Sequence, residues 1–247
     1  LSINSYIAAL TISLIIGFVL ILIGRKAIKK LNFIEQLILI ISVYILIGFL
    51  ISIPYYLSNL KVTFLSSFFE AISGLTGTGF STFKNIKYLD PTLILWRSSS
   101  QWVGGFYFLI FLVLIFSNKQ FNYKMIDLTY SGDGSINSED NIKNLLLRIF
   151  IIYSFLSFII FLFLNISNVR LFNSLNLSMS LISAGGFLPT DSLNTIIKTT
   201  PQKIIFAFSL LVSMLNFFLI LNIFEKKIII REHKEDLYLI ILALVFI

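Results

Sequence analysis

The chain has 247 residues, of which 57% are hydrophobic and 13% are charged, and its net charge is +7. Apolar runs of about twenty residues recur, the length that crosses about 30 Å of hydrocarbon, so the composition predicts an integral membrane protein. The Lys and Arg residues lie in short segments between these runs and form no continuous basic face, which argues against nucleic acid as a partner. Because the chain has no cysteine, disulfides and thiolate metal sites are excluded.

The apolar runs predict five membrane-spanning helices, at about residues 5–24, 36–58, 92–117, 142–165 and 201–224. The residues between them predict the orientation, because cytoplasmic loops are enriched in Lys and Arg. Segments 25–30, 118–143 and 225–234 each carry three or four such residues and are predicted to be cytoplasmic. Segments 59–91 and 166–200 carry fewer for their length and are predicted to lie outside.

The outer segment 62–83 is itself apolar enough to enter the membrane. A full crossing there would reverse every later loop and place a lysine-rich loop outside, against the positive-inside rule. We therefore predict a re-entrant segment that enters and leaves on the same side. It would consist of a helix of about 18 Å from Thr63 to Gly74 and an extended return through LTGTGFS.

The outer segment 170–193 repeats this plan. Aligning TGTGF with SAGGF pairs Gly79 with Gly186 and Phe80 with Phe187, 107 positions apart. Each unit then reads span, half-length helix, glycine-rich return and span, and a repeat of this kind is a stronger signal than one short motif.

The repeat divides the chain into four parts: a leading helix and basic loop (1–32), a first pore-loop repeat (33–141), a second pore-loop repeat (142–224), and a cytoplasmic linker with the start of a third repeat (225–247). We expect the polypeptide to continue past Ile247, because its last apolar run is too short to cross the bilayer.

Non-helical backbone at membrane depth occurs only where it is buried in protein or lines a water-filled path. A glycine-rich return can aim successive carbonyl oxygens at one axis, where they replace the hydration shell of a cation. The preceding helix directs its partly negative C-terminal end to the same place. The predicted cation-binding residues are Thr76, Gly77, Thr78, Gly79, Ser183, Ala184, Gly185 and Gly186, and Phe80 and Phe187 complete the two predicted filter segments.

The stretch FFEAISGLTGTGFS, followed by LWRSSSQWVGGFYFLIFLV, resembles the first pore repeat of the superfamily of potassium transporters, in the Trk and Ktr type of membrane subunit. SAGGFLPTD resembles the filter of its second repeat. The resemblance covers residues 31–236, and the leading span is similar to the extra N-terminal helices of the Trk branch.

This resemblance implies an all-α integral membrane fold of four span, pore-loop, span repeats around one potassium pathway, of which this chain holds two. It also implies potassium uptake across the bacterial inner membrane, with potassium as the transported ion and no other cofactor. Among partners it implies membrane lipid, a homodimer and a cytoplasmic nucleotide-binding regulatory subunit.

Two positions depart from the family pattern: Gly77 stands where Thr is usual, and Ala184 precedes the second pair of glycines. Each change removes a hydroxyl, so the accommodation of sodium stays open. The alternative function is a sodium-tolerant or non-conducting paralogue that acts as a membrane scaffold. The remaining hydroxyls near the returns favour conduction, and no nucleophile, base or metal-ligand set at matched depth points to an enzyme.

Three sets of residues outside the returns also have expected roles. Glu70 and Arg97 are costly in lipid and are expected to face each other as a structural pair rather than to bind the ion. Gly104 and Gly105 are expected to permit close helix packing, with gating as the alternative. Asn216 either lines the inner vestibule or bonds between helices.

Overall fold

The computed structural model describes residues 3–25, 31–58, 62–116, 139–224, 238 and 241–242. These residues form helices and connecting segments without strands, so the predicted all-α fold is confirmed. The helices are α1 (Ile3–Gly24), α2 (Phe33–Tyr56), α3 (Phe64–Leu75), α4 (Pro91–Phe116), α6 (Glu139–Ile166), α7 (Leu171–Ile182), α8 (Thr200–Met214) and α9 (Phe217–Phe224). Two short 3-10 turns, η1 (Ile86–Tyr88) and η2 (Leu193–Thr195), lie in the segments predicted to be outside.

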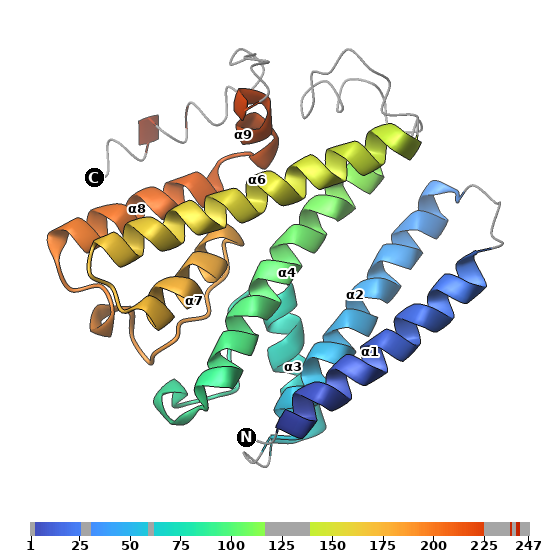
Figure 1. Ribbon diagram of the computed structural model, residues 1–247, viewed down its shortest axis with the longest axis horizontal. Coiled ribbons are helices and arrows are strands. Elements are labelled where there is room, and N and C mark those ends of the chain that lie inside the picture. Colours follow the sequence, from blue (N-terminus) through green and yellow to red (C-terminus); the bar gives the residue numbers. More distant parts are fainter. Residues whose placement is uncertain are drawn as a thin grey trace.

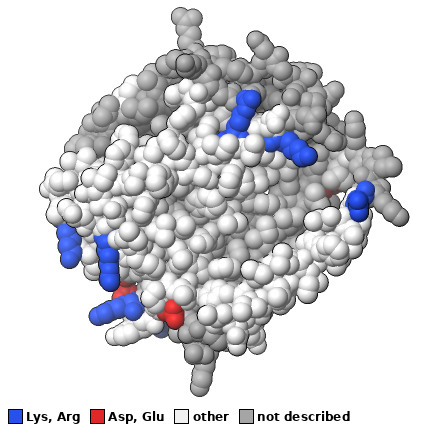
Figure 2. Space-filling view, in the orientation of Figure 1, with Lys and Arg blue, Asp and Glu red and all other residues white. Residues whose placement is uncertain are grey.

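Most residues of the predicted cytoplasmic loops lie outside the described residues. The same holds for most of 225–247, which was predicted to be a linker and the start of a third repeat. Among the described residues, four helices are long and apolar enough to cross a membrane: Ile3–Gly24, Phe33–Tyr56, Pro91–Ile115 and Lys143–Ile166. They correspond to the first four predicted spans. Figure 2 shows charged side chains toward the ends of the molecule and a broad uncharged band between them, which suits a hydrocarbon environment. The protein is therefore a multi-pass membrane protein.

The fifth predicted span, 201–224, is wrong as a continuous helix. The helix stops at Met214 and resumes at Phe217 (Figure 1), because Leu215 is extended, with φ −66° and ψ 149°. The Asn216 side-chain oxygen accepts a hydrogen bond of 3.0 Å from Phe218 N, which satisfies one of the free N–H groups at the start of α9. Hydropathy does not detect such a break, since Leu, Asn and Phe are all compatible with an apolar segment.

Two half-length helices, α3 and α7, precede the predicted returns. Each has 12 residues, or about 18 Å of rise, and Figure 1 shows both in the same half of the bundle. Thr63 begins the first of them by accepting a hydrogen bond of 3.3 Å from Ser66 N, so the predicted helix agrees with the observed one to within a residue. In the described residues, both repeats therefore have the predicted order of span, short helix with return, and span, apart from the break in the last span.

The central helix α4 packs against α2, α3, α6 and α7, so it joins the two repeats. Its indole N–H groups bond across the helix interfaces, Trp96 to Ile51 O at 3.0 Å and Trp102 to Ser157 Oγ at 2.9 Å. Asp90 lies just before α4 and accepts from the backbone and the hydroxyl of Thr92, which lowers the pKa of the Asp90 carboxyl from its usual value. These bonds fix the helix that backs both filter segments.

Candidate functional site

The two returns leave their helices along the same backbone path. Thr78 N donates to Ser73 O at 3.1 Å and, 107 positions later, Gly185 N donates to Ser180 O at 2.8 Å. The two serine hydroxyls also donate to loop carbonyls: Ser73 Oγ lies 2.5 Å from Phe80 O, and Ser180 Oγ lies 3.1 Å from Gly185 O. A serine in the last turn of each short helix therefore shapes the loop that follows, a role that the sequence analysis did not assign.

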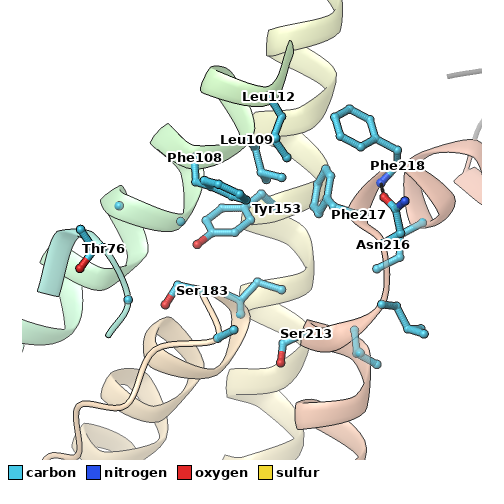
Figure 3. Close-up of a pocket in the computed structure, with 18 of the residues that line it drawn as sticks. Thr76, Phe108, Leu109, Leu112, Tyr153, Ser183, Ser213, Asn216, Phe217 and Phe218 are labelled. Carbon is cyan, nitrogen blue, oxygen red and sulfur yellow. Dashed lines mark hydrogen bonds between the residues drawn. The ribbon is translucent and has the colours of Figure 1, made fainter. Parts of the chain in front are cut away.

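The hydroxyls at the start of the returns point their hydrogens back into the helices. Thr76 Oγ1 donates to Ile72 O at 2.8 Å, and Ser183 Oγ donates to Met179 O at 3.0 Å. A hydroxyl whose hydrogen is used in this way still has lone pairs with which to accept. Both side chains also line a cavity beneath the loops (Figure 3).

Most of the predicted coordinating carbonyls are unused by the protein. The carbonyl oxygens of residues 76–79 accept no hydrogen bond from any described residue, and the same holds for Ser183, Ala184 and Gly186. Gly185 O differs, because it accepts from Ser180 Oγ. Backbone carbonyls at membrane depth need a partner, so these rows are suited to bind water or a cation.

Left-handed backbone occurs at one equivalent position of the two loops and at a second position of the first loop alone. The φ angles are +70° at Gly77, +75° at Gly79 and +51° at Ala184. Ala184 lies 107 positions after Gly77, so it occupies a position where the first repeat has glycine. The sequence analysis treated Ala184 only as the loss of a hydroxyl, although pairing it with Gly77 could have indicated its conformation.

Ala184→Gly is expected to stabilise the protein. A Cβ in the left-handed region costs about 1–2 kcal/mol, and glycine removes this cost. Glycine also gives the unfolded chain more conformational freedom, which offsets about half of the gain. The free energy of unfolding should therefore rise by about 0.5–1 kcal/mol. Thermal unfolding of the detergent-solubilised protein measures the change. Ala207→Gly, inside α8, is the matched control and should lower the stability. A lower unfolding midpoint for Ala184→Gly than for the native protein would contradict the left-handed conformation of residue 184.

The two loops face each other through their glycines. A Cβ built on Gly79 would lie 2.6 Å from Gly186 Cα, and one built on Gly77 would lie 3.5 Å from Ser183 O. The equivalent residues Gly79 and Gly186 are thus neighbours, with no side chain between them. The phenylalanines that follow differ: Phe80 is 72% exposed, whereas Phe187 is buried.

Glu70 and Arg97 are in contact, as a structural pair requires. Arg97 Nε lies 2.7 Å from Glu70 Oε1, and both side chains are almost completely buried. The carboxylate also accepts from Ser81 Oγ at 2.9 Å and from Thr82 N at 2.8 Å. Glu70 thereby ties the return of the first loop back to its own helix, and none of these bonds involves residues 76–79.

Arg97 also reaches the second loop. Its Nη1 donates to Leu188 O at 3.4 Å, and its guanidinium carbon lies 4.1 Å from the centre of the Phe187 ring. Further out, Asp191 Oδ1 accepts from Ile86 N at 2.5 Å, which joins the second outer segment to η1 of the first. Neither link between the repeats was predicted.

The glycines of α4 lie where the short helices end. A Cβ on Gly104 would collide with the backbone of Leu75, and one on Gly105 would lie 2.6 Å from Tyr153 Oη and 2.8 Å from Ser183 Cβ. Close packing therefore accounts for both glycines. Without them, α4 could not support the bases of the two loops.

A cavity of about 440 Å³ lies beneath the two loops (Figure 3). The starts of both returns line it on one side, and the break between α8 and α9 lines it on the other. Asn216, Phe217 and Phe218 lie at that break, so Asn216 borders the cavity while it caps α9. The other lining residues are mainly apolar, including Tyr44, Phe108, Leu109, Leu112, Val212 and Ile220.

The fold and the paired loops define a multi-pass helical membrane protein with re-entrant, pore-type segments. A family profile described as cation transport protein matches residues 2–242, nearly the whole chain. The chain belongs to this TrkH family of cation transport proteins, which confirms the resemblance to the Trk and Ktr type of membrane subunit. The family is one of transporters and not of enzymes.

Individual relatives agree with this assignment. The chain is 27% identical over 175 residues to an uncharacterized cation transporter of Methanocaldococcus jannaschii, covering 70% of this chain and 35% of that protein. It is 25% identical over 214 residues to the Trk system potassium uptake protein TrkH of Salmonella typhimurium, covering 83% of this chain and 43% of that protein. The chain thus spans less than half the length of these relatives.

The fold also matches a solved structure. The crystal structure of the potassium transporter TrkH from Vibrio parahaemolyticus superposes with a TM-score of 0.73 at 20% identity, over 90% of this chain and 45% of that one. At this identity the match supports the fold, and the candidate ion-binding residues rest on the geometry described above.

Proposed function

We propose that this chain forms part of a potassium-uptake pathway in which the backbone carbonyls of residues 76–79 and 183–186 coordinate the ion. The observation that carries the proposal is the close approach of Gly79 and Gly186, flanked by carbonyls of which all but that of Gly185 lack a donor among the described residues. Such rows can replace a cation's hydration shell, and the C-terminal ends of α3 and α7 favour positive charge beside them.

The two loops are proposed to supply about half of the coordinating ring. A carbonyl filter removes water from an ion only if oxygens approach from all sides of the axis. The relatives are about twice as long as this chain, so two further loops are proposed to complete the ring. A homodimer in a bacterial inner membrane, regulated by a cytoplasmic nucleotide-binding subunit, is the proposed setting.

The alternatives are a sodium-tolerant transporter and a non-conducting scaffold. Gly77 and Ala184 lack the hydroxyl of the usual pattern, but their left-handed φ angles keep the backbone path, which supports selective conduction. A scaffold would not need two loops with free carbonyl rows. Potassium uptake is therefore the preferred function.

Expression of the natural polypeptide in a bacterium without its own potassium-uptake systems tests the proposal. We expect growth at low potassium and faster uptake of potassium than of sodium, compared with an empty vector. Equal uptake of the two ions would identify a sodium-tolerant transporter. Correct membrane insertion without uptake of either ion would support the scaffold and overturn the proposal.

A further inference from the structure

The second filter loop lacks the internal brace of the first. The position equivalent to Glu70, 107 residues later, is Leu177, which is buried and has no hydrogen-bonding group on its side chain. The return of the second loop therefore cannot be tied to its own helix as Ser81 and Thr82 are tied to α3. Gly185 is bonded to Ser180 of that helix, so the backbone groups that need partners from elsewhere in the fold are those of Phe187 and Leu188.

Gln101 of α4 supplies such a partner. Its side chain is fully buried, and its Oε1 accepts a hydrogen bond of 3.3 Å from Phe187 N. A Cβ built on Gly185 would lie 2.6 Å from both Oε1 and Nε2 of Gln101, so the side-chain amide rests directly against the backbone of Gly185. One helical turn earlier, Arg97 holds Leu188 O and the Phe187 ring.

We propose that Gln101 is a positioning residue for ion selectivity, which sets the path of residues 185–187 and so makes the second filter loop dependent on a helix of the first repeat. The proposal rests on the function proposed above, because selectivity is the property that a misplaced carbonyl would change. Gln101 does not coordinate the ion. It acts through Gly185 and Phe187, which it contacts.

Gly185 offers a specific test of this contact. Its φ angle lies outside the left-handed region, so alanine there meets no conformational penalty of the kind expected at Gly79. The three atoms nearest to a Cβ on Gly185 all belong to the Gln101 side chain. An effect of Gly185→Ala should therefore depend on Gln101, whereas the effect of Gly79→Ala arises from the backbone of Gly186 and should not.

The experiment measures the ratio of potassium to sodium uptake in the natural polypeptide carrying Gly185→Ala, Gln101→Ala or both. We expect Gly185→Ala to lower the ratio about tenfold in the native background and to cause no further loss beside Gln101→Ala, a coupling typical of residues in contact. Gly79→Ala is the matched control and should abolish selectivity both with and without Gln101→Ala. Equal effects of Gly185→Ala in both backgrounds would overturn the proposal.

Gln101→Met tests the hydrogen bond separately from the packing, because methionine has a similar length but no amide oxygen. The uptake ratio should fall while the amount of protein in the membrane stays the same, and an unchanged ratio would overturn the positioning role. Thermal unfolding of the single and double variants separates the two proposals. If the native protein takes up no potassium, the proposed function fails. Additive shifts of the unfolding midpoint for Gly185→Ala and Gln101→Ala would, independently of uptake, overturn the positioning role of Gln101.

Discussion

Gly79→Ala is expected to abolish selective potassium uptake while the protein still reaches the membrane. Gly79 has φ +75°, and an added Cβ would lie 2.6 Å from Gly186 Cα and 2.9 Å from Gly186 N. Both atoms are backbone and cannot turn aside as a side chain can. A strained conformation alone costs about 1–3 kcal/mol, and the separation of the two loops would displace the facing carbonyls as well.

Uptake of potassium and sodium by a deficient host, together with the amount of protein in the membrane fraction, measures this effect. Gly17→Ala in α1 is the matched control, since no atom lies within 4 Å of a Cβ built there, and its uptake should equal that of the native protein. If the Gly79→Ala variant kept the native affinity and selectivity for potassium, Gly79 would not be part of the filter.

Arg97→Met is expected to cause the largest loss of stability. It would leave the Glu70 carboxylate buried without its positive partner, and breaking a buried ion pair from one side costs about 3–5 kcal/mol. It would also remove the contacts of Arg97 with Leu188 and Phe187 in the second loop. We therefore expect a much lower unfolding midpoint in detergent and a reduced yield of folded protein.

The double variant Glu70→Gln with Arg97→Met should recover part of this loss, because it removes the unpaired charge and leaves an amide that can still accept from Thr82 N. Arg170→Met is the control, since Arg170 is exposed and its replacement should change the free energy of unfolding by less than about 0.5 kcal/mol. An Arg97→Met protein as stable as Arg170→Met would show that the pair is dispensable.

The cavity beneath the paired loops is bordered by a broken helix. A continuous fifth span would have no free N–H groups at this depth, whereas the break exposes the start of α9 and uses Asn216 to satisfy one of them. The polar Asn216 is therefore required by the local backbone. Of the two interpretations offered from the sequence, the lining of a cavity agrees with its position, whereas the bond to Phe218 N caps α9 and does not join two helices.

The sequence by itself determined the class of protein, four of the spans, both short helices and the residues of the two returns. These features depend on properties of the local sequence. Apolar runs have the length that crosses a membrane, a further crossing would place a lysine-rich loop outside, and glycines lie where the extended backbone must turn. The 107-residue repeat also paired Gly79 with Gly186, residues that the fold brings into contact. Glu70 and Arg97 could be paired because two buried charges in an apolar protein need each other.

Only the tertiary structure decided how the two repeats support each other. The bond from Phe187 N to Gln101 and the contact of Arg97 with Leu188 join residues 86 and 91 positions apart, and no periodicity connects such positions. The break at Leu215 likewise arises from the path that the packed chain must follow. The left-handed conformation of Ala184 is against the preference of alanine, and its alignment with Gly77 permits this conformation without establishing it. Local sequence can specify a helix or a turn, but the partners of a buried polar group are chosen by which helices pack together.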